Sequence, residues 1–305
     1  MAFPMGLDCI IVGGGPAGLT AATYLRRLHR RVIVFDDGRS RARWIPESHN
    51  CPGFPLGVSG TELLRRLRDQ ASTYGAPIHH KRVELLERAR EGWRVEAEGE
   101  QWFAPVVLLA TGVVDRLPTL ASGDPEVALR NGLLRSCALC DGYEATDQRI
   151  AVVGPLDKAV SNARYLSTFS ADITVAPTDA VDLGPSAQPD TKGVTVLPPL
   201  QILACTAGGW DLTDLTGHTH RFDLVYAAMG APARGELAPH AGAQVDAQGA
   251  VVTNERMETS CSGLYAIGDA VTDLNQIAVA FGHAAIAASA IHQTLPARPR
   301  KSTQV

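Results

Sequence analysis

The sequence has little net charge, few cysteines and no long apolar segment, and each shortage excludes a class of protein. Among its 305 residues, 28 Lys and Arg face 32 Asp and Glu, so no basic surface for nucleic acid or an anionic membrane is expected. The most apolar late stretch, residues 277–291, is too short to span a bilayer. Residues 1–8 lack the regions of a secretory signal, and we therefore expect a cytoplasmic protein.

Six cysteines in a chain of this length are too few for a disulfide scaffold. Four of them are solitary, namely Cys9, Cys51, Cys205 and Cys261. Cys137 and Cys140 form a single Cys-x-x-Cys pair, which in a reducing compartment favours catalysis or metal binding over a structural bridge.

The length favours two domains, at roughly 150 residues for each. Residues 9–36 and 149–176 both read as a buried strand, a glycine turn, a helix and a second strand. We therefore predict an α/β fold with two Rossmann-like, three-layer nucleotide-binding domains. Residues after 240 do not continue the second unit and are best placed back in the first. The expected domains are 1–116 with 241–305, which form one discontinuous domain, and 117–240 between them.

The first glycine turn matches a dinucleotide-binding fingerprint. Gly13 would make the tight turn, Gly15 would let the backbone approach a pyrophosphate, and Gly18 would let the helix pack on the strand. Asp36 ends the second strand and can accept hydrogen bonds from a ribose. The predicted nucleotide site comprises Gly13, Gly15, Pro16, Ala17, Gly18 and Asp36.

A second acidic residue, Asp269, follows an apolar strand and Gly268 near the end of the chain. Its carboxylate could accept hydrogen bonds from a polyol such as the ribityl chain of a flavin. Taken alone, Asp269 would be an ordinary helix N-cap. The dinucleotide-binding fingerprint at residues 13–18 favours the polyol interpretation.

The Cys137/Cys140 pair is open to three interpretations, which are dithiol chemistry, half of a zinc site and an unpaired structural motif. A structural zinc site needs four ligands, and the sequence has no second Cys-x-x-Cys. The pair His218 and His220 lies far along the chain, so dithiol chemistry is favoured and no metal is expected. Asp141 follows directly and is either the proton donor and acceptor of thiol–disulfide exchange or a surface acid in a turn.

Several motifs together resemble the low-molecular-weight thioredoxin reductase family. They are residues 13–18, 48–54, 109–112, 137–142 and 265–270, followed by Gln276. The resemblance covers nearly the whole chain. It implies an FAD-binding domain, a central domain that carries the dithiol, a homodimer, and a thioredoxin-like protein or a small disulfide or dithiol as partner.

The resemblance also implies roles for individual residues. Cys140 would face the flavin, Cys137 would exchange with the partner, and Asp141 would be the acid/base. Asn50 would lie against the isoalloxazine, and the helix opened by Gln276 would stabilise the anionic reduced flavin through its dipole. Further cofactor-binding residues by the same resemblance are Ala110, Thr111, Gly112, Gly268, Asp269 and Ile277.

The second glycine turn departs from the family pattern. Gly154 and Ala159 keep two positions of the fingerprint, but Leu156 replaces its second glycine, and its side chain is expected to stand where a pyrophosphate must touch the backbone. Pro155 removes an N–H donor from the turn. After the next strand, residues 176–179 offer an acid and no Arg for a 2′-phosphate.

We therefore predict an FAD-dependent thiol–disulfide oxidoreductase that works without NADPH. Among proteins resembling thioredoxin reductase, some take electrons from ferredoxin and one type holds a second flavin. Two rival hypotheses remain. One is an NADPH-dependent thioredoxin-disulfide reductase with an altered cofactor site, and the other is a non-catalytic flavin-binding redox sensor.

Overall fold

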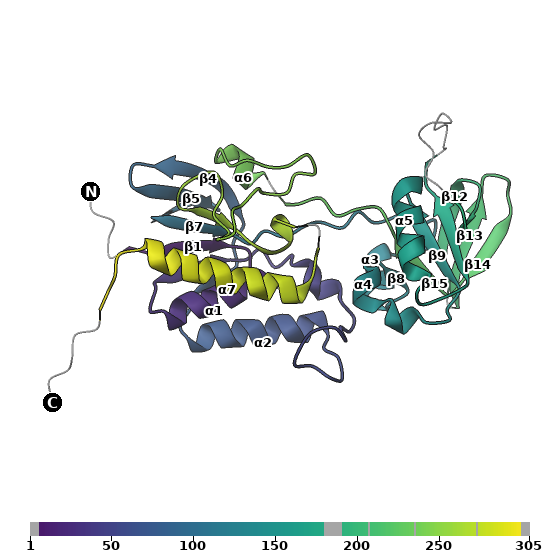
Figure 1. Ribbon diagram of the computed structural model, residues 1–305, viewed down its shortest axis with the longest axis horizontal. Coiled ribbons are helices and arrows are strands. Elements are labelled where there is room, and N and C mark those ends of the chain that lie inside the picture. The colour runs from purple at the N-terminus through teal and green to yellow at the C-terminus, as the bar shows by residue number, and fades with distance from the viewer. Residues whose placement is uncertain (1–5, 180–190, 207, 235, 273, 300–305) are drawn as a thin grey trace. The chain divides into compact units, whose positions relative to one another are not determined.

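The structure is a computed structural model that describes residues 6–179, 191–206, 208–234, 236–272 and 274–299. The chain forms two compact units, and each is described by itself (Figure 1). The first unit comprises Met1–Ala42, Glu62–Val113 and Pro232–Val305, and the second comprises Arg43–Thr61 and Val114–Ala231. Among the described residues, no helix has the length and apolar character needed to cross a membrane.

The first unit is built on a five-stranded parallel sheet with the order β16-β7-β1-β2-β3. The strands are β1 (Cys9–Val12), β2 (Val32–Phe35), β3 (Ile78–His79), β7 (Val106–Leu109) and β16 (Leu264–Ala266). Every residue of β1, β2, β7 and β16 is buried, as expected for parallel strands covered on both faces.

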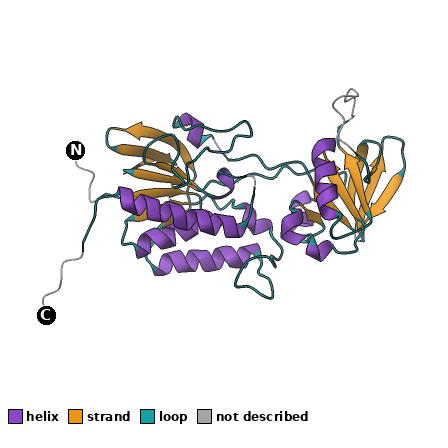
Figure 2. Ribbon diagram, viewed as in Figure 1, coloured by secondary structure: helices purple, strands orange, loops and turns teal. Residues whose placement is uncertain are grey.

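Helices cover one face of this sheet and an antiparallel sheet covers the other (Figures 1 and 2). The helices of the unit are α1 (Pro16–Arg27), α2 (Gly60–Thr73), α6 (Leu237–His240), α7 (Ile277–Thr294) and the 3-10 helix η3 (Gly268–Ala270). The 3-10 helix η1 (Arg41–Trp44) and the first two residues of α2 cross the boundary between the units. Helices α1 and α7 pack side by side. The antiparallel strands are β4 (Val83–Ala89), β5 (Gly92–Ala97) and β6 (Glu100–Ala104). Ile10 and Val12 of β1 pack with Trp93 and Val95 of β5 to form the core between the two sheets.

The second unit repeats this plan with the parallel order β11-β10-β9-β15-β8. Its parallel strands are β8 (Leu134–Arg135), β9 (Ile150–Gly154), β10 (Ile173–Pro177), β11 (Thr195–Val196) and β15 (Leu224–Ala227). An antiparallel sheet of β12 (Leu200–Thr206), β13 (Gly209–Asp214) and β14 (Thr219–Phe222) covers one face. The helices are α3 (Pro125–Arg130), α4 (Ala138–Asp141), α5 (Leu156–Leu166) and the 3-10 helix η2 (Tyr143–Ala145).

The two units therefore correspond strand by strand, with β1, β2 and β7 of the first matching β9, β10 and β15 of the second. Each parallel sheet carries a three-stranded antiparallel sheet on one face. The edge strands β16 and β8 also occupy matching places, next to β7 and β15 respectively. They differ in chain order, because β16 is the last strand of the first unit and β8 is the first strand of the second. The prediction of an α/β fold with two Rossmann-like domains, the first of them discontinuous, is confirmed.

The boundaries between the units differ from the expected ones at two places. Residues 232–240 belong to the first unit, because Ala238 of α6 is buried in its core. Arg43–Thr61 belongs to the second unit, where Trp44 packs against the core and lies 4.6 Å from the guanidinium of Arg130. Neither contact could be read from local sequence pattern, since each joins segments far apart in the chain.

Candidate active site

A glycine turn joins β1 to α1 at the carboxyl edge of the first sheet. A side chain at Gly13 would come within 2.2 Å of the carbonyl oxygen of Ala110, and one at Gly18 within 1.9 Å of the carbonyl oxygen of Gly13. No Cβ fits at these distances, so only glycine allows the strand, turn and helix to pack this closely. Gly15 is the N-cap of α1 and Pro16 opens the helix, whose first turn has no side-chain cap. These backbone N–H groups suit an anion such as a diphosphate.

Asp36 follows β2 directly, and its side chain lies against the same turn. A side chain at Gly14 would lie 2.3 Å from Cγ of Asp36, which is itself 2% exposed. Oδ1 of Asp36 accepts the N–H of Gly38 at 3.0 Å, and Oδ2 accepts from Nη2 of Arg68 at 2.9 Å. The buried carboxylate is thus paired with a cation. Arg68 gave no sequence signal, since it lies among other arginines of α2 that pair on the surface.

Further predicted residues lie at the same carboxyl edge, because parallel strands end together there. They are Ala110, Thr111 and Gly112 after β7, and Gly268 and Asp269 after β16. Oδ2 of Asp269 lies 3.6 Å from Nη1 of Arg41.

Helix α7 begins beside this edge, with Gln276 as its N-cap and Ile277 as its first residue. The N–H of Gly268 donates to Nδ1 of His283, which lies on α7, at 3.3 Å. Burial lowers the pKa of His283, so the imidazole is held in the neutral form that can accept this bond. Sequence reasoning missed His283, because nothing local distinguishes it from a surface histidine of the helix.

Asn50 lies in the second unit, close to the redox segment. Ser48 Oγ donates to Oδ1 of Asn50 at 3.0 Å, and Nδ2 of Asn50 donates to the carbonyl of Leu139 at 3.4 Å. Leu139 stands between the two cysteines of the Cys-x-x-Cys pair. The structure therefore groups Asn50 with the redox segment, whereas the expected domain boundaries placed it in the FAD-binding domain.

A disulfide joins Cys137 and Cys140, whose Cα atoms are 5.3 Å apart. Cys137 is the N-cap of the one-turn helix α4, and the N–H of Cys140 donates to the carbonyl of Cys137 at 3.0 Å. Both cysteines are partly exposed, and two apolar side chains close to them in sequence are open to solvent, Leu139 at 47% and Tyr143 at 79%. The arrangement suits a disulfide that exchanges with an outside partner.

Asp141 ends α4 directly after Cys140, and its carboxyl accepts a hydrogen bond from another residue of the same unit. Tyr226 donates its hydroxyl to Oδ1 of Asp141 at 2.8 Å. Burial raises the pKa of Asp141 from 3.8 to about 6, against the opposing effects of Arg135 and of the Tyr226 hydrogen bond. A carboxyl with this pKa can hold or release a proton near neutral pH. The alternative that Asp141 is a plain surface acid does not fit its partly buried, bonded side chain.

The second glycine turn corrects one expectation. Leu156 is only 6% exposed and packs in the apolar core with Ala159 and Val160, so its side chain does not stand in the turn. Helix α5 begins at this residue, and its apolar face takes the leucine inward. The prediction that Leu156 occupies the place of a pyrophosphate is therefore wrong.

Three other features that the sequence indicated are present, namely the close approach at Gly154, the missing N–H of Pro155 and the residues after β10. A side chain at Gly154 would come within 2.6 Å of the carbonyl oxygen of Ala228, a close approach that repeats the one at Gly13. Pro155 is the N-cap of α5 and supplies no N–H. Thr178 and Asp179 follow β10 and are exposed.

Comparison with known proteins gives the family. A family model described as pyridine nucleotide-disulphide oxidoreductase matches residues 7–284. The thioredoxin reductase of Mycolicibacterium smegmatis is 30% identical over 297 residues, which cover 92% of this chain and 94% of that protein. The chain belongs to the thioredoxin reductase family of pyridine nucleotide-disulphide oxidoreductases.

Solved structures agree with this membership. HlmI superposes with a TM-score of 0.86 at 25% identity and covers 96% of this chain and 93% of its own. The thioredoxin reductase of Streptococcus pyogenes MGAS5005 superposes with a TM-score of 0.83 at 27% identity, over 94% of this chain and 97% of its own. As a member of the family, the protein is a flavin-dependent disulfide oxidoreductase.

Family membership implies FAD, and the first unit fits it. Gly13 and Gly18 let the strand, turn and helix pack more closely than any side chain would allow, the start of α1 offers backbone N–H groups, and Asp36 supplies a buried carboxylate beside the turn. The narrower prediction of a subgroup that works without NADPH has no support in these relatives.

Proposed function

We propose that the protein is an FAD-dependent thioredoxin-disulfide reductase that takes its electrons from NADPH. The observation that carries the proposal is the partly exposed Cys137–Cys140 disulfide with the bonded, partly buried Asp141 at its end. The match to the pyridine nucleotide-disulphide oxidoreductase family supports the donor, and the relatives named thioredoxin reductase support the partner. This support for NADPH outweighs the sequence-based argument against it, because one of the three grounds of that argument, Leu156 standing in the turn, does not hold.

When bound, FAD would accept two electrons from a reduced donor and pass them to a disulfide. Gly13, Gly15, Pro16, Ala17 and Gly18 would hold its diphosphate at the start of α1, and Asp36 its ribose. Asp269, with Arg41 beside it, would bind the polyol chain. The N-terminus of α7, at Gln276, would favour negative charge on the reduced ring.

Reduction breaks the Cys137–Cys140 bond and uses two electrons and two protons to leave two thiols. Asp141 is the group that gives one proton as the disulfide opens and takes it back as the bond re-forms. In the second half, Cys137 gives up its proton and its thiolate attacks the partner's disulfide, which forms a mixed disulfide and frees one partner sulfur that takes up that proton. Cys140 then gives its proton to Asp141 and displaces the second partner sulfur, which is protonated from solvent, so the partner leaves with two thiols while the Cys137–Cys140 bond returns.

A second candidate keeps this dithiol chemistry without NADPH, with ferredoxin or a second flavin as the source of electrons. The favouring observation is the end of β10, where Pro177, the last residue of the strand, and Thr178 and Asp179 after it provide no cation for a 2′-phosphate. Pro155 also lacks the N–H that a diphosphate would use. A homodimer and a cytoplasmic location stay predictions for both candidates.

The deciding experiment is an anaerobic titration of the purified protein with NADPH, followed through its visible spectrum, and then with dithiothreitol. Bleaching of the flavin by NADPH, with reduction of thioredoxin during turnover, supports the proposal. Bleaching by dithiothreitol alone favours the second candidate, and bleaching by neither excludes a disulfide oxidoreductase. Cys137→Ser and Cys140→Ser should abolish thioredoxin reduction, whereas Cys205→Ser, a free cysteine on β12, should retain it.

A further inference from the structure

We propose that Tyr226, supported by Arg135, is a positioning residue that fixes the Asp141 carboxyl for proton transfer at the redox disulfide. The inference rests on the proposed function, because it gives Asp141 the proton-transfer role described there. It concerns two residues for which the sequence patterns gave no role.

The three residues meet because two parallel strands end beside α4. Tyr226 on β15 and Arg135 on β8 are direct partners in the strand register. The hydroxyl of Tyr226 lies 2.8 Å from Oδ1 of Asp141, and Nη1 of Arg135 lies 3.3 Å from that hydroxyl. The contact spans 85 positions in the chain, so the sheet, and no local turn, brings Tyr226 to Asp141.

The chemistry of Arg135, Tyr226 and Asp141 decides which of them donates each hydrogen bond. Arg135 can only donate, and its Nη1 serves both the hydroxyl oxygen of Tyr226 and the carbonyl of Asp141, the latter at 2.6 Å. Tyr226 has one proton to give, and burial raises its pKa, so the phenol stays protonated. With the Asp141 carbonyl already bonded by Arg135, that proton is best used at Oδ1.

The hydroxyl of Tyr226 is a polar group on a buried residue and therefore needs hydrogen-bond partners. Tyr226 is 1% exposed and packs in the core of the unit, where a phenylalanine would fill almost the same volume without a polar atom to satisfy. Its hydroxyl bonds only Arg135 and Asp141 among the described residues. The polar atom is therefore directed at the redox segment.

The electrostatic consequence has a definite sign. Burial raises the pKa of Asp141, Glu144 adds to the rise, and both the charge of Arg135 and the Tyr226 hydrogen bond lower it. A hydrogen bond to a carboxylate stabilises the charged form. Tyr226 and Arg135 thus keep a partly buried carboxyl able to ionise near pH 6, while fixing the direction of one of its oxygens.

The test compares Tyr226→Phe, Asp141→Asn and wild type in the full-length holoenzyme, with two readouts across pH. One readout is the turnover number for disulfide reduction, and the other is the rate at which iodoacetamide alkylates the reduced protein. Tyr226→Phe should move the Asp141-dependent pKa upward by about one unit in both profiles. Asp141→Asn should abolish that pKa. Arg135→Gln should move it in the same direction as Tyr226→Phe, which covers a failure of that variant to fold.

Tyr265→Phe is the matched control, since Tyr265 is a tyrosine that is also 1% exposed, on β16 of the first unit. It loses a buried hydroxyl and should leave both profiles in place. If Asp141→Asn removes the pKa but neither Tyr226→Phe nor Arg135→Gln moves it, the inference is overturned while the role of Asp141 stands. If Asp141→Asn leaves the profiles unchanged, the proton-transfer step of the proposed function fails as well.

Discussion

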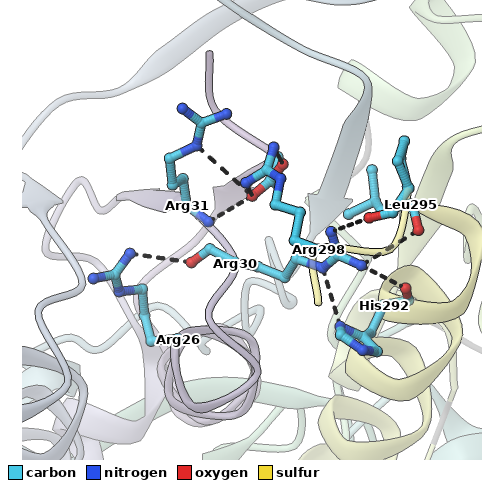
Figure 3. Close-up of polar contacts among 8 residues, drawn as sticks. Arg26, Arg30, Arg31, His292, Leu295 and Arg298 are labelled. Carbon is cyan, nitrogen blue, oxygen red and sulfur yellow. Dashed lines mark hydrogen bonds and ion pairs between the residues drawn. The ribbon is translucent and has the colours of Figure 1, made fainter. Parts of the chain in front are cut away.

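Arg30 donates a hydrogen bond from Nε to Nδ1 of His292 over 3.0 Å, and so links the segment between α1 and β2 to the end of α7 (Figure 3). The guanidinium, on a residue that is 2% exposed, also donates to the carbonyls of His292 and Pro296 at 2.9 Å and of Leu295 at 3.3 Å. These carbonyls follow or end a helix and have no partner within it. A buried cation at a helix C-terminus also suits the helix dipole.

Replacing this cation should destabilise the first unit. Arg30→Met leaves the last carbonyls of α7 buried without a donor, and we expect the free energy of unfolding to fall by about 3 kcal/mol. Urea unfolding followed by far-UV circular dichroism measures it. Arg27→Met, at an exposed position that ends α1, should change it by less than about 0.5 kcal/mol. Equal effects of the two substitutions would show that the contacts of Arg30 contribute nothing.

Two glycines in helices predict opposite responses to alanine. At Gly18 a methyl group would meet the carbonyl oxygen of Gly13 at 1.9 Å, so Gly18→Ala should displace the turn and lower both flavin content and thermal stability. At Gly282, an exposed position of α7, a methyl group would meet no atom within 4 Å apart from its chain neighbours and the backbone of its own helix. Gly282→Ala should therefore raise the free energy of unfolding by about 0.5–1 kcal/mol.

The ratio of flavin to protein absorbance and the melting temperature check both expectations. A Gly18→Ala protein with full flavin and an unchanged melting temperature would contradict the close packing of β1 and α1.

The raised pKa of Asp141 gives the oxidised protein a pH-dependent stability. Because the folded-state pKa is about 6 and the ordinary value is 3.8, the folded protein binds the proton more tightly than the unfolded chain. The contribution of Asp141 is therefore fully present below about pH 4 and is lost as the pH rises through 6. Asp141→Asn cannot ionise, so at pH 8 it should exceed wild type in free energy of unfolding by on the order of 2 kcal/mol.

Urea unfolding at pH 4 and pH 8, with the disulfide intact, measures the difference. Glu91→Gln, which removes an exposed carboxyl in the turn between β4 and β5, should show no such gain on going to pH 8. A constant difference between Asp141→Asn and wild type at both pH values would mean that the carboxyl is well hydrated.

The local patterns of the sequence were sufficient for the architecture and for part of the site. Apolar runs followed by glycine turns predicted both parallel sheets, because a buried strand and a tight turn are properties of neighbouring residues. The Cys137/Cys140 pair could also be recognised locally, because its two cysteines are only three positions apart in the chain. Family resemblance, carried by short motifs, predicted the enzyme class.

The direction of a side chain and its distant partners were decided by the tertiary structure alone. The sequence shows that Leu156 is bulky, but only the packing of α5 on its sheet turns it into the core and out of the glycine turn. Likewise, Arg68 meets Asp36, and Tyr226 meets Asp141, across 32 and 85 positions of the chain. Periodicity tells which residues are buried but not which residue each will face, because that depends on how separate strands and helices align.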